Sequence, residues 1–261
     1  MSDIHQQRQV AESFGVDAER YDRTRPSYPE AVIKRIVEAA PGPAFLDVGT
    51  GTGIAARQLQ AAGADVLGLD VDERMAEQAR RRGLEVEVAK FEDWDPRGRR
   101  FDAVVAATTW HWIDPALGAA KAAEILKNQA IVALMWNVGE PPAELKSVFA
   151  ANSARIFPGM PNPWASTVPM VEAYQAIPDR AMAGLNQSGA FAQPEQWRTD
   201  WELTYTRDDW LDLILTHGGL AAHITPEQAD ELRTATGAAI DAHGGTVTMH
   251  YSTLTVLAKR A

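Results

Sequence analysis

Short apolar runs alternate along much of the chain with segments in which apolar positions recur every three or four residues. The runs predict strands over residues 44–48, 65–70, 84–89, 101–107 and 129–136. The periodic segments predict helices over residues 29–40, 54–62, 73–82 and 115–126. Strands that alternate with short helices are typical of crossover units, in which helices cover both faces of a parallel sheet.

The alternation stops after Asn137. The next segment, residues 138–190, is rich in proline and holds one helix-like piece over residues 144–157. We expect this segment to form an inserted cap, because long insertions between strands are usually functional. The pattern resumes with a strand over residues 197–207, helices over 209–217 and after Thr225, and a last strand over 245–258.

Together these elements predict an α/β fold. We expect a Rossmann-like, doubly wound and mostly parallel seven-stranded sheet with an antiparallel last strand and an inserted cap. The chain of 261 residues is long enough to bury a full core, and we expect one domain over residues 1–261. Within it, residues 1–40 are expected to form an N-terminal helical lid.

The charge balance narrows the range of partners. Lysine and arginine number 25 and aspartate and glutamate number 35, which gives a net charge of −10. An acidic chain is poorly suited to a phosphate backbone, so we expect no nucleic-acid partner. No apolar run approaches the roughly 20 residues that cross a bilayer, so we expect no membrane partner. Cysteine is absent; this excludes thiolate metal sites and fits a cytoplasmic location, and we predict no metal.

A glycine-rich turn joins the first strand to the helix that follows it, with glycines at positions 49, 51 and 53. Dinucleotide-binding folds space their glycines as G-x-G-x-x-G and hold a pyrophosphate at the helix N-terminus. Here the third glycine comes one residue early, and Ile54 occupies its usual position. Asp47 stands in the approach to the turn, where it would repel a pyrophosphate and suit a ligand that carries positive charge.

Asp70 ends the second strand, seventeen residues beyond Gly53. A carboxylate at this point of such a fold can accept hydrogen bonds from both hydroxyls of a ribose. The turn and the acid therefore predict a ligand that has a ribose and a cationic group in place of a phosphorylated one. S-adenosylmethionine fits this description, because it carries an adenosine, a sulfonium and an ammonium.

The chain resembles the class I S-adenosylmethionine-dependent methyltransferases. Within them it is similar to a small-molecule branch (methyltransferase type 11) that includes trans-aconitate methyltransferase-like proteins. The likeness covers nearly the whole chain and rests on the segments FLDVGTGTG, VLGLDVDERM, FDAVVAATTWHWID, YDRTRPSYP and MHYSTLTVLAKR. It implies S-adenosyl-L-methionine as the cofactor and S-adenosyl-L-homocysteine as the product.

The resemblance also implies a set of cofactor contacts. These are Tyr21, Arg25, Asp47, Gly49, Thr50, Gly51, Asp70, Val71, Met75, Phe91, Glu92, Thr108 and Thr109. Asp70 would hold the ribose, Met75 would pack against the adenine, and Arg25 would neutralise the carboxylate. The chain departs from many relatives at Lys90, where they carry an acid.

The segment Trp110-His111-Trp112 follows the fourth strand, at the carboxyl edge of the sheet where open α/β folds bind ligands. We predict Trp110 and Trp112 as substrate contacts and His111 as the catalytic residue. A hydroxyl acceptor would need a base, and His111 could serve. A carboxylate acceptor would need none, and His111 would then be a hydrogen-bond partner.

We therefore expect methyl transfer to a small-molecule acceptor, with oxygen, as a carboxylate or a hydroxyl, favoured over nitrogen and carbon. Two alternatives stay open: a non-catalytic S-adenosylmethionine-binding protein, and a nicotinamide-dependent oxidoreductase with an irregular turn. No pattern in the chain identifies the acceptor or the oligomeric state.

Overall fold

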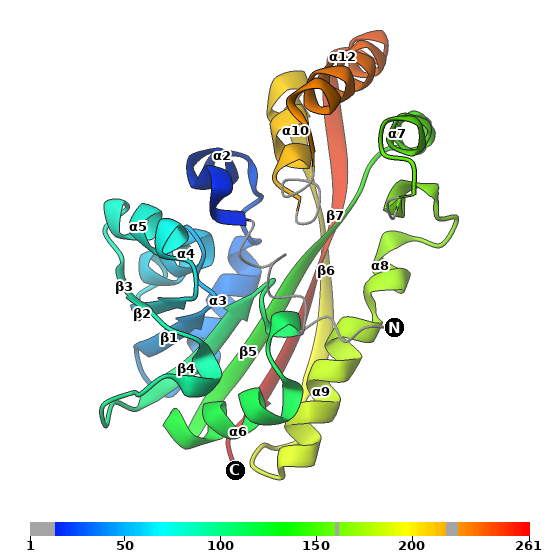
Figure 1. Ribbon diagram of the computed structural model, residues 1–261. Coiled ribbons are helices and arrows are strands. Elements are labelled where there is room, and N and C mark those ends of the chain that lie inside the picture. Colours follow the sequence, from blue (N-terminus) through cyan, green and yellow to red (C-terminus); the bar gives the residue numbers. More distant parts are fainter. Residues whose placement is uncertain (1–13, 160–161, 218–223) are drawn as a thin grey trace.

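The computed structural model describes residues 14–159, 162–217 and 224–261. Within them, a twisted sheet of seven strands runs through the centre in the order β3-β2-β1-β4-β5-β7-β6 (Figure 1). The strands are β1 (Ala44–Val48), β2 (Asp65–Asp70), β3 (Glu85–Val88), β4 (Phe101–Ala107), β5 (Leu126–Glu140), β6 (Glu195–Thr206) and β7 (Thr246–Lys259).

The strand directions confirm the predicted fold class. β1 to β5 are parallel, and β7 lies antiparallel to its neighbours β5 and β6. β5 begins earlier than predicted, because the buried Leu126 already pairs with Phe101 before the regular register starts at Ile131. The strand order reverses between the neighbours β1 and β4. The crevice at the carboxyl ends of two such strands is where ligands bind in open α/β sheets.

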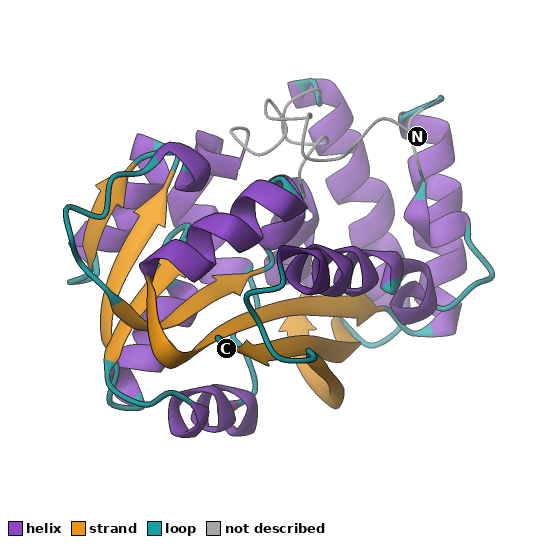
Figure 2. Cartoon of the chain, turned by 90° about the horizontal axis from the view of Figure 1, so that it is seen from below, coloured by secondary structure: helices purple, strands orange, loops and turns teal. Residues whose placement is uncertain are grey.

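Helices cover both faces of the sheet (Figure 2). One face carries α3 (Glu30–Ala39), α4 (Ile54–Ala61) and α5 (Glu73–Arg81), and the other carries α6 (Pro115–Ile125), α8 (Met170–Tyr174) and α9 (Ala176–Ser188). Each face of the sheet has its own apolar core under these helices, and successive residues of β1 point to opposite faces. Phe45 packs into the core of the first face and Leu46 into the core of the second, and both are fully buried. A strand that is buried on both faces needs an unbroken apolar run, which explains the pattern in the sequence.

A third apolar cluster surrounds the carboxyl end of β6 and the amino end of β7. There α7 (Ala143–Ile156), α10 (Arg207–Leu215) and α12 (Pro226–Ala242) meet (Figure 1). The ring of Trp210 stacks on Phe149 with 4.1 Å between the centroids. Residues 138–190 thus divide in two, because α7 and the short η5 (Pro163–Ala165) join this cluster, whereas α9 packs on the sheet beside α6.

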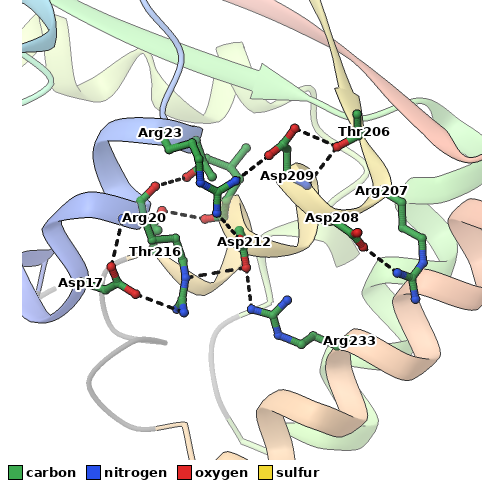
Figure 3. A network of polar contacts seen from close by, with 12 residues as sticks. Asp17, Arg20, Arg23, Thr206, Arg207, Asp208, Asp209, Asp212, Thr216 and Arg233 are labelled. Atoms are coloured by element: carbon green, nitrogen blue, oxygen red, sulfur yellow. Dashed lines mark hydrogen bonds and ion pairs between the residues drawn. The ribbon is translucent and has the colours of Figure 1, made fainter.

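The first thirteen residues of the predicted lid lie outside the described residues, and the rest begins with η2 (Phe14–Asp17) and α2 (Ala18–Thr24). Ion pairs join α2 to α10, and α10 in turn to α12 (Figure 3). Arg23 of α2 pairs with Asp209 at 2.6 Å and also with Asp212, and Arg233 of α12 reaches Asp212 at 2.5 Å. Among the helices described, none is long and apolar enough to span a membrane.

Candidate active site

The turn between β1 and α4 needs glycine for two different reasons. Gly49 and Gly51 both have left-handed backbone angles, with φ of 64° and 57°. A Cβ on Gly49 would in addition lie 2.0 Å from Cγ2 of Thr109, so that position has no room for a side chain. A Cβ on Gly51 would lie 3.6 Å from Cε of Met75, an ordinary contact, so the backbone angle alone requires glycine there.

Asp70, at the carboxyl end of β2, faces this turn. Its Oδ2 accepts a hydrogen bond from the backbone N–H of Gly51 at 2.7 Å, and its Oδ1 accepts one from the N–H of Asp72 at 2.9 Å. The residue is 9% exposed. Burial raises the pKa of Asp70 above its usual value, although the two backbone N–H groups act to lower it. Further donors, such as two hydroxyl groups, would stabilise the carboxylate.

Asp47, two residues before the turn, is fully buried. The hydroxyl of Thr50 donates to its Oδ2 at 2.7 Å. Its other oxygen, Oδ1, is buried and has no hydrogen-bond partner in the part of the chain that the structure describes. Burial raises the pKa of Asp47 to about 7, against the effect of the Thr50 hydroxyl. The carboxyl group is therefore a buried acceptor, and no group in the described ranges pairs with one of its oxygens.

Two adjoining cavities open above the switch point of the sheet, a larger one of about 480 Å³ and a smaller one of about 140 Å³. Most of the predicted site residues line the larger cavity: Tyr21, Arg25, Gly49, Gly51, Asp70, Val71, Met75, Phe91, Glu92, Thr108, Thr109, His111 and Trp112. Folding thus brings residues from α2 and from the ends of β1, β2, β3 and β4 around one space.

Three predicted residues lie elsewhere. Thr50 lines the smaller cavity, and Asp47 lies beneath the turn without lining either one. Trp110 is only 2% exposed and packs against Phe91, with 6.0 Å between the ring centroids. Trp110 therefore belongs to the core under the site, and its position does not fit the substrate contact that we predicted for it.

His111 occupies η4 (Trp110–Trp112), the short turn after β4. Its ring lies beside Trp112, with 4.8 Å between the centroids. On another side, Nε1 of Trp136 in β5 donates a hydrogen bond to Nδ1 of His111 at 3.3 Å. Burial lowers the pKa of His111 to about 4, so the imidazole is neutral near pH 7.

The segment after α2 contributes to the lining of both cavities. Arg25 donates from Nε to Oγ1 of Thr216 at 3.1 Å and from Nη2 to the carbonyl oxygen of Thr216 at 2.9 Å. The hydroxyl of Tyr28 lies 2.9 Å from that of Thr108, after β4. Arg25 and Thr108 line both cavities, so these contacts join the lid to the site.

Sequence reasoning missed most residues around the smaller cavity. They include Tyr28, Asn137, Gly139, Trp164, Trp210, His217, Met249 and Tyr251. These residues come from the loop after α2, from β5, η5, β7 and the region of α10, and no local motif connects them. One usable signal is the spacing of Met249 and Tyr251, because residues two apart on a strand point to the same side of the sheet.

Comparisons with known proteins show which proteins the chain is similar to. Residues 45–129 match the family model of a methyltransferase domain, a range that holds the glycine turn, Asp70 and His111. Over 133 residues the chain is 35% identical to uncharacterized methyltransferases of Mycobacterium bovis and Mycobacterium tuberculosis. The chain is thus similar to methyltransferases over about half of its length, and residues 45–129 are similar to a methyltransferase domain.

The similarity to these relatives covers only part of each chain. The curated match takes in 50% of the chain and 54% of each mycobacterial relative, so the chain spans about half of their length. A structure from Anaeromyxobacter dehalogenans, described as a type II methyltransferase, is 20% identical. The superposition covers 89% of this chain and 97% of the chain of that structure, with a TM-score of 0.62.

A second structure comes from work on the conversion of a disulfide bond into a thioacetal group during echinomycin biosynthesis. It is 18% identical to this chain. The superposition covers 90% of this chain and 85% of the chain of that structure, with a TM-score of 0.50. At these identities the two structures support the fold of the chain and nothing finer. The likeness to the trans-aconitate branch stays a prediction.

Proposed function

We propose that the chain binds S-adenosyl-L-methionine in the larger cavity and transfers its methyl group to a small molecule. The observation that carries the proposal is the buried Oδ1 of Asp47, which has no hydrogen-bond partner among the described residues and lies just before a glycine turn. An unpaired buried carboxylate disfavours a diphosphate nearby and favours a cation. A ligand with a sulfonium and an ammonium meets that requirement.

The residues present also suit the nucleoside part of this ligand. Asp70 already holds Gly51 and Asp72 through one oxygen each, and each oxygen keeps capacity for one more donor. Two ribose hydroxyls would complete this set. Met75 and Phe91 are buried apolar residues on the cavity wall and offer a surface for a planar base.

The edge of the base would meet a polar group that differs from the one in many relatives. Lys90 lines the larger cavity, and its Nζ lies 3.6 Å from Oε1 of Glu92. The same Glu92 oxygen accepts the backbone N–H of Asp114 at 3.4 Å. We propose that Glu92 accepts the adenine amino group in place of the acid that relatives carry at the position of Lys90.

The lid would close over the methionine end of the cofactor. Tyr21 and Arg25 line both cavities, and the guanidinium of Arg25 lies 4.8 Å from the centre of the Tyr21 ring. A guanidinium held in this way can pair with a carboxylate. Thr108 and Thr109 also line the larger cavity, and the sulfonium would lie beside them.

When bound, the cofactor supplies a methyl group activated by the positive sulfonium. The protein must hold the acceptor atom in line with that methyl group. Such orientation can lower the activation barrier by about 7–11 kcal/mol. The smaller cavity adjoins the larger one and has aromatic walls from Trp164, Trp210 and Tyr251. We propose that it binds the acceptor, with oxygen as the favoured atom.

Calorimetry tests this assignment directly. We expect S-adenosylmethionine to bind and nicotinamide dinucleotide not to bind. The Asp70→Ala variant should weaken binding at least 100-fold, because it removes acceptors for two hydroxyls and for Gly51. Asp102→Asn is the matched control, since Asp102 is also a buried carboxylate that accepts a backbone N–H but lines neither cavity. Equal affinity in wild type and Asp70→Ala would refute the proposal.

A second measurement separates an enzyme from a binding protein that does not catalyse. S-adenosylmethionine with a labelled methyl group is incubated with the protein and a metabolite extract. Transfer of label to a small molecule supports the enzyme. Binding without any transfer, in extracts from several sources, would favour a non-catalytic S-adenosylmethionine-binding protein.

A further inference from the structure

The tautomer of His111 is set by a residue that lies outside both cavities. Trp136 is fully buried in the middle of β5, and its indole N–H can only donate a hydrogen bond. The acceptor is Nδ1 of His111, at 3.3 Å. An imidazole nitrogen that accepts a hydrogen bond carries a lone pair and no proton.

A neutral imidazole has one protonated nitrogen. If Nδ1 bears the lone pair, the proton is on Nε2, which then becomes a donor. Burial favours the neutral ring, so both nitrogens are not protonated together near pH 7. Among the described residues, no side chain or backbone group is hydrogen-bonded to Nε2. This nitrogen is left for a ligand, since His111 lines the larger cavity.

We propose that Trp136 is a positioning residue that holds His111 as the Nε2–H tautomer, so that His111 donates a hydrogen bond to the bound ligand and does not act as a base. A base would need its lone pair on the nitrogen that faces the ligand, and the Trp136 indole places that lone pair on Nδ1. The chemical group that fits opposite Nε2 is an oxygen or nitrogen with a lone pair. The role in catalysis rests on the proposed function, whereas the tautomer does not.

Nitrogen-15 NMR of the histidine rings tests the tautomer in the protein without cofactor or acceptor. The His111→Gln variant assigns the signal by its disappearance. At neutral pH we expect one protonated nitrogen, assigned to Nε2, and one unprotonated nitrogen, assigned to Nδ1. A proton on Nδ1, or a doubly protonated ring, would overturn the proposal.

The Trp136→Phe variant tests the cause. It keeps an aromatic ring in the core and removes the N–H group, so we expect the His111 signals to shift toward a mixture of the two tautomers. Trp94→Phe is the matched control: Trp94 is also buried and also donates its indole N–H, but to Glu87 at 2.6 Å. If both variants leave the His111 signals unchanged, Trp136 does not set the tautomer.

Circular dichroism verifies that each variant is folded before its spectrum is interpreted. Where Trp136→Phe fails to fold, the wild-type signals alone still decide between the two tautomers. Calorimetry with S-adenosylmethionine is a separate measurement, so an Nε2–H ring in a protein that does not bind this cofactor would refute the proposed function and leave the tautomer standing.

Discussion

The carboxylate of Asp70 accepts the backbone N–H of Gly51 at 2.7 Å, although the two residues lie 19 positions apart in the chain. The same carboxylate holds the N–H of Asp72 at the start of α5 (Glu73–Arg81). Asp70 is thus part of the framework of the glycine turn as well as a candidate ribose acceptor. Its substitution should affect the protein before any ligand is added.

We predict that Asp70→Asn loosens the turn. In either orientation, the amide presents its NH₂ to one of the two backbone N–H groups, and that group loses its acceptor. The free energy of unfolding should fall by about 1–3 kcal/mol. Hydrogen exchange of Gly51 or Asp72 should become faster without ligand. An unchanged exchange rate at both positions would contradict the framework role.

The pKa of Asp47 leads to a prediction about pH. Burial raises this pKa from 3.8 to about 7, so the folded state holds a proton that the unfolded state releases. The group therefore lowers the free energy of unfolding as pH rises from about 4 to 7, and the loss is complete above that range. We predict that Asp47→Asn is more stable than wild type at pH 8, by on the order of a few kcal/mol.

Denaturant unfolding at several pH values measures this effect. The difference between Asp47→Asn and wild type should shrink toward zero as the pH approaches 4, where the wild-type carboxyl is protonated in both states. The variant also keeps an acceptor for the Thr50 hydroxyl. A difference that is the same at pH 4 and pH 8 would show that ionisation of Asp47 is not its source.

The sequence was informative wherever the site is built from consecutive residues. The glycine turn, Asp70 and Thr109 each lie at or just after the carboxyl end of a strand, and parallel strands bring their carboxyl ends to one edge. It was harder to predict which of the two neighbouring tryptophans lies in the core and which lines the cavity. Trp110 enters the core and Trp112 faces the cavity, because they lie two residues apart in a tight turn. Local pattern does not fix the rotation of such a turn.

The residues that line the smaller cavity could not be predicted from local sequence patterns, for a different reason. Trp210 and Tyr251 line it together, although they belong to α10 and β7. Their approach depends on how α10 packs at the end of the sheet. The same holds for the contact of Arg25 with Thr216, which joins residues 191 positions apart. Apolar periodicity places each element, and packing between distant elements decides which side chains meet.

The ion pairs between α2 and α10 hold α2 beside the larger cavity. We therefore predict that they slow the release of the cofactor. Asp212 is 16% exposed and pairs with Arg20, Arg23 and Arg233 (Figure 3). We expect Asp212→Asn to increase the dissociation rate of S-adenosylmethionine about threefold to tenfold, because α2 carries Tyr21 and leads into Arg25. Stopped-flow displacement measures the rate.

Asp208→Asn is the control for this variant. Asp208 lies on the same helix and pairs with Arg207, but its side chain is 82% exposed. Pairs this exposed contribute little, so the rate should not change.

The same ion pairs also make stability depend on pH. Burial acts to raise the pKa of Asp212, but hydrogen bonds from Arg233 and Arg23 outweigh it and hold the pKa low. The ion pairs therefore stabilise the folded state fully above about pH 4, and this stabilisation is lost as the pH falls through the lowered pKa of Asp212 in the folded protein.

The inferred tautomer of His111 leads to the last prediction, which concerns methyl transfer. The amide NH₂ of glutamine can occupy the position of Nε2 and donate, but glutamine cannot accept a proton as a base. We therefore expect His111→Gln to retain label transfer from S-adenosylmethionine to a metabolite extract within about threefold of wild type, and His111→Ala to lose about tenfold or more. Thin-layer separation of the labelled products measures both. If glutamine is as inactive as alanine while binding of S-adenosylmethionine is unchanged, His111 acts as a base and not as a donor.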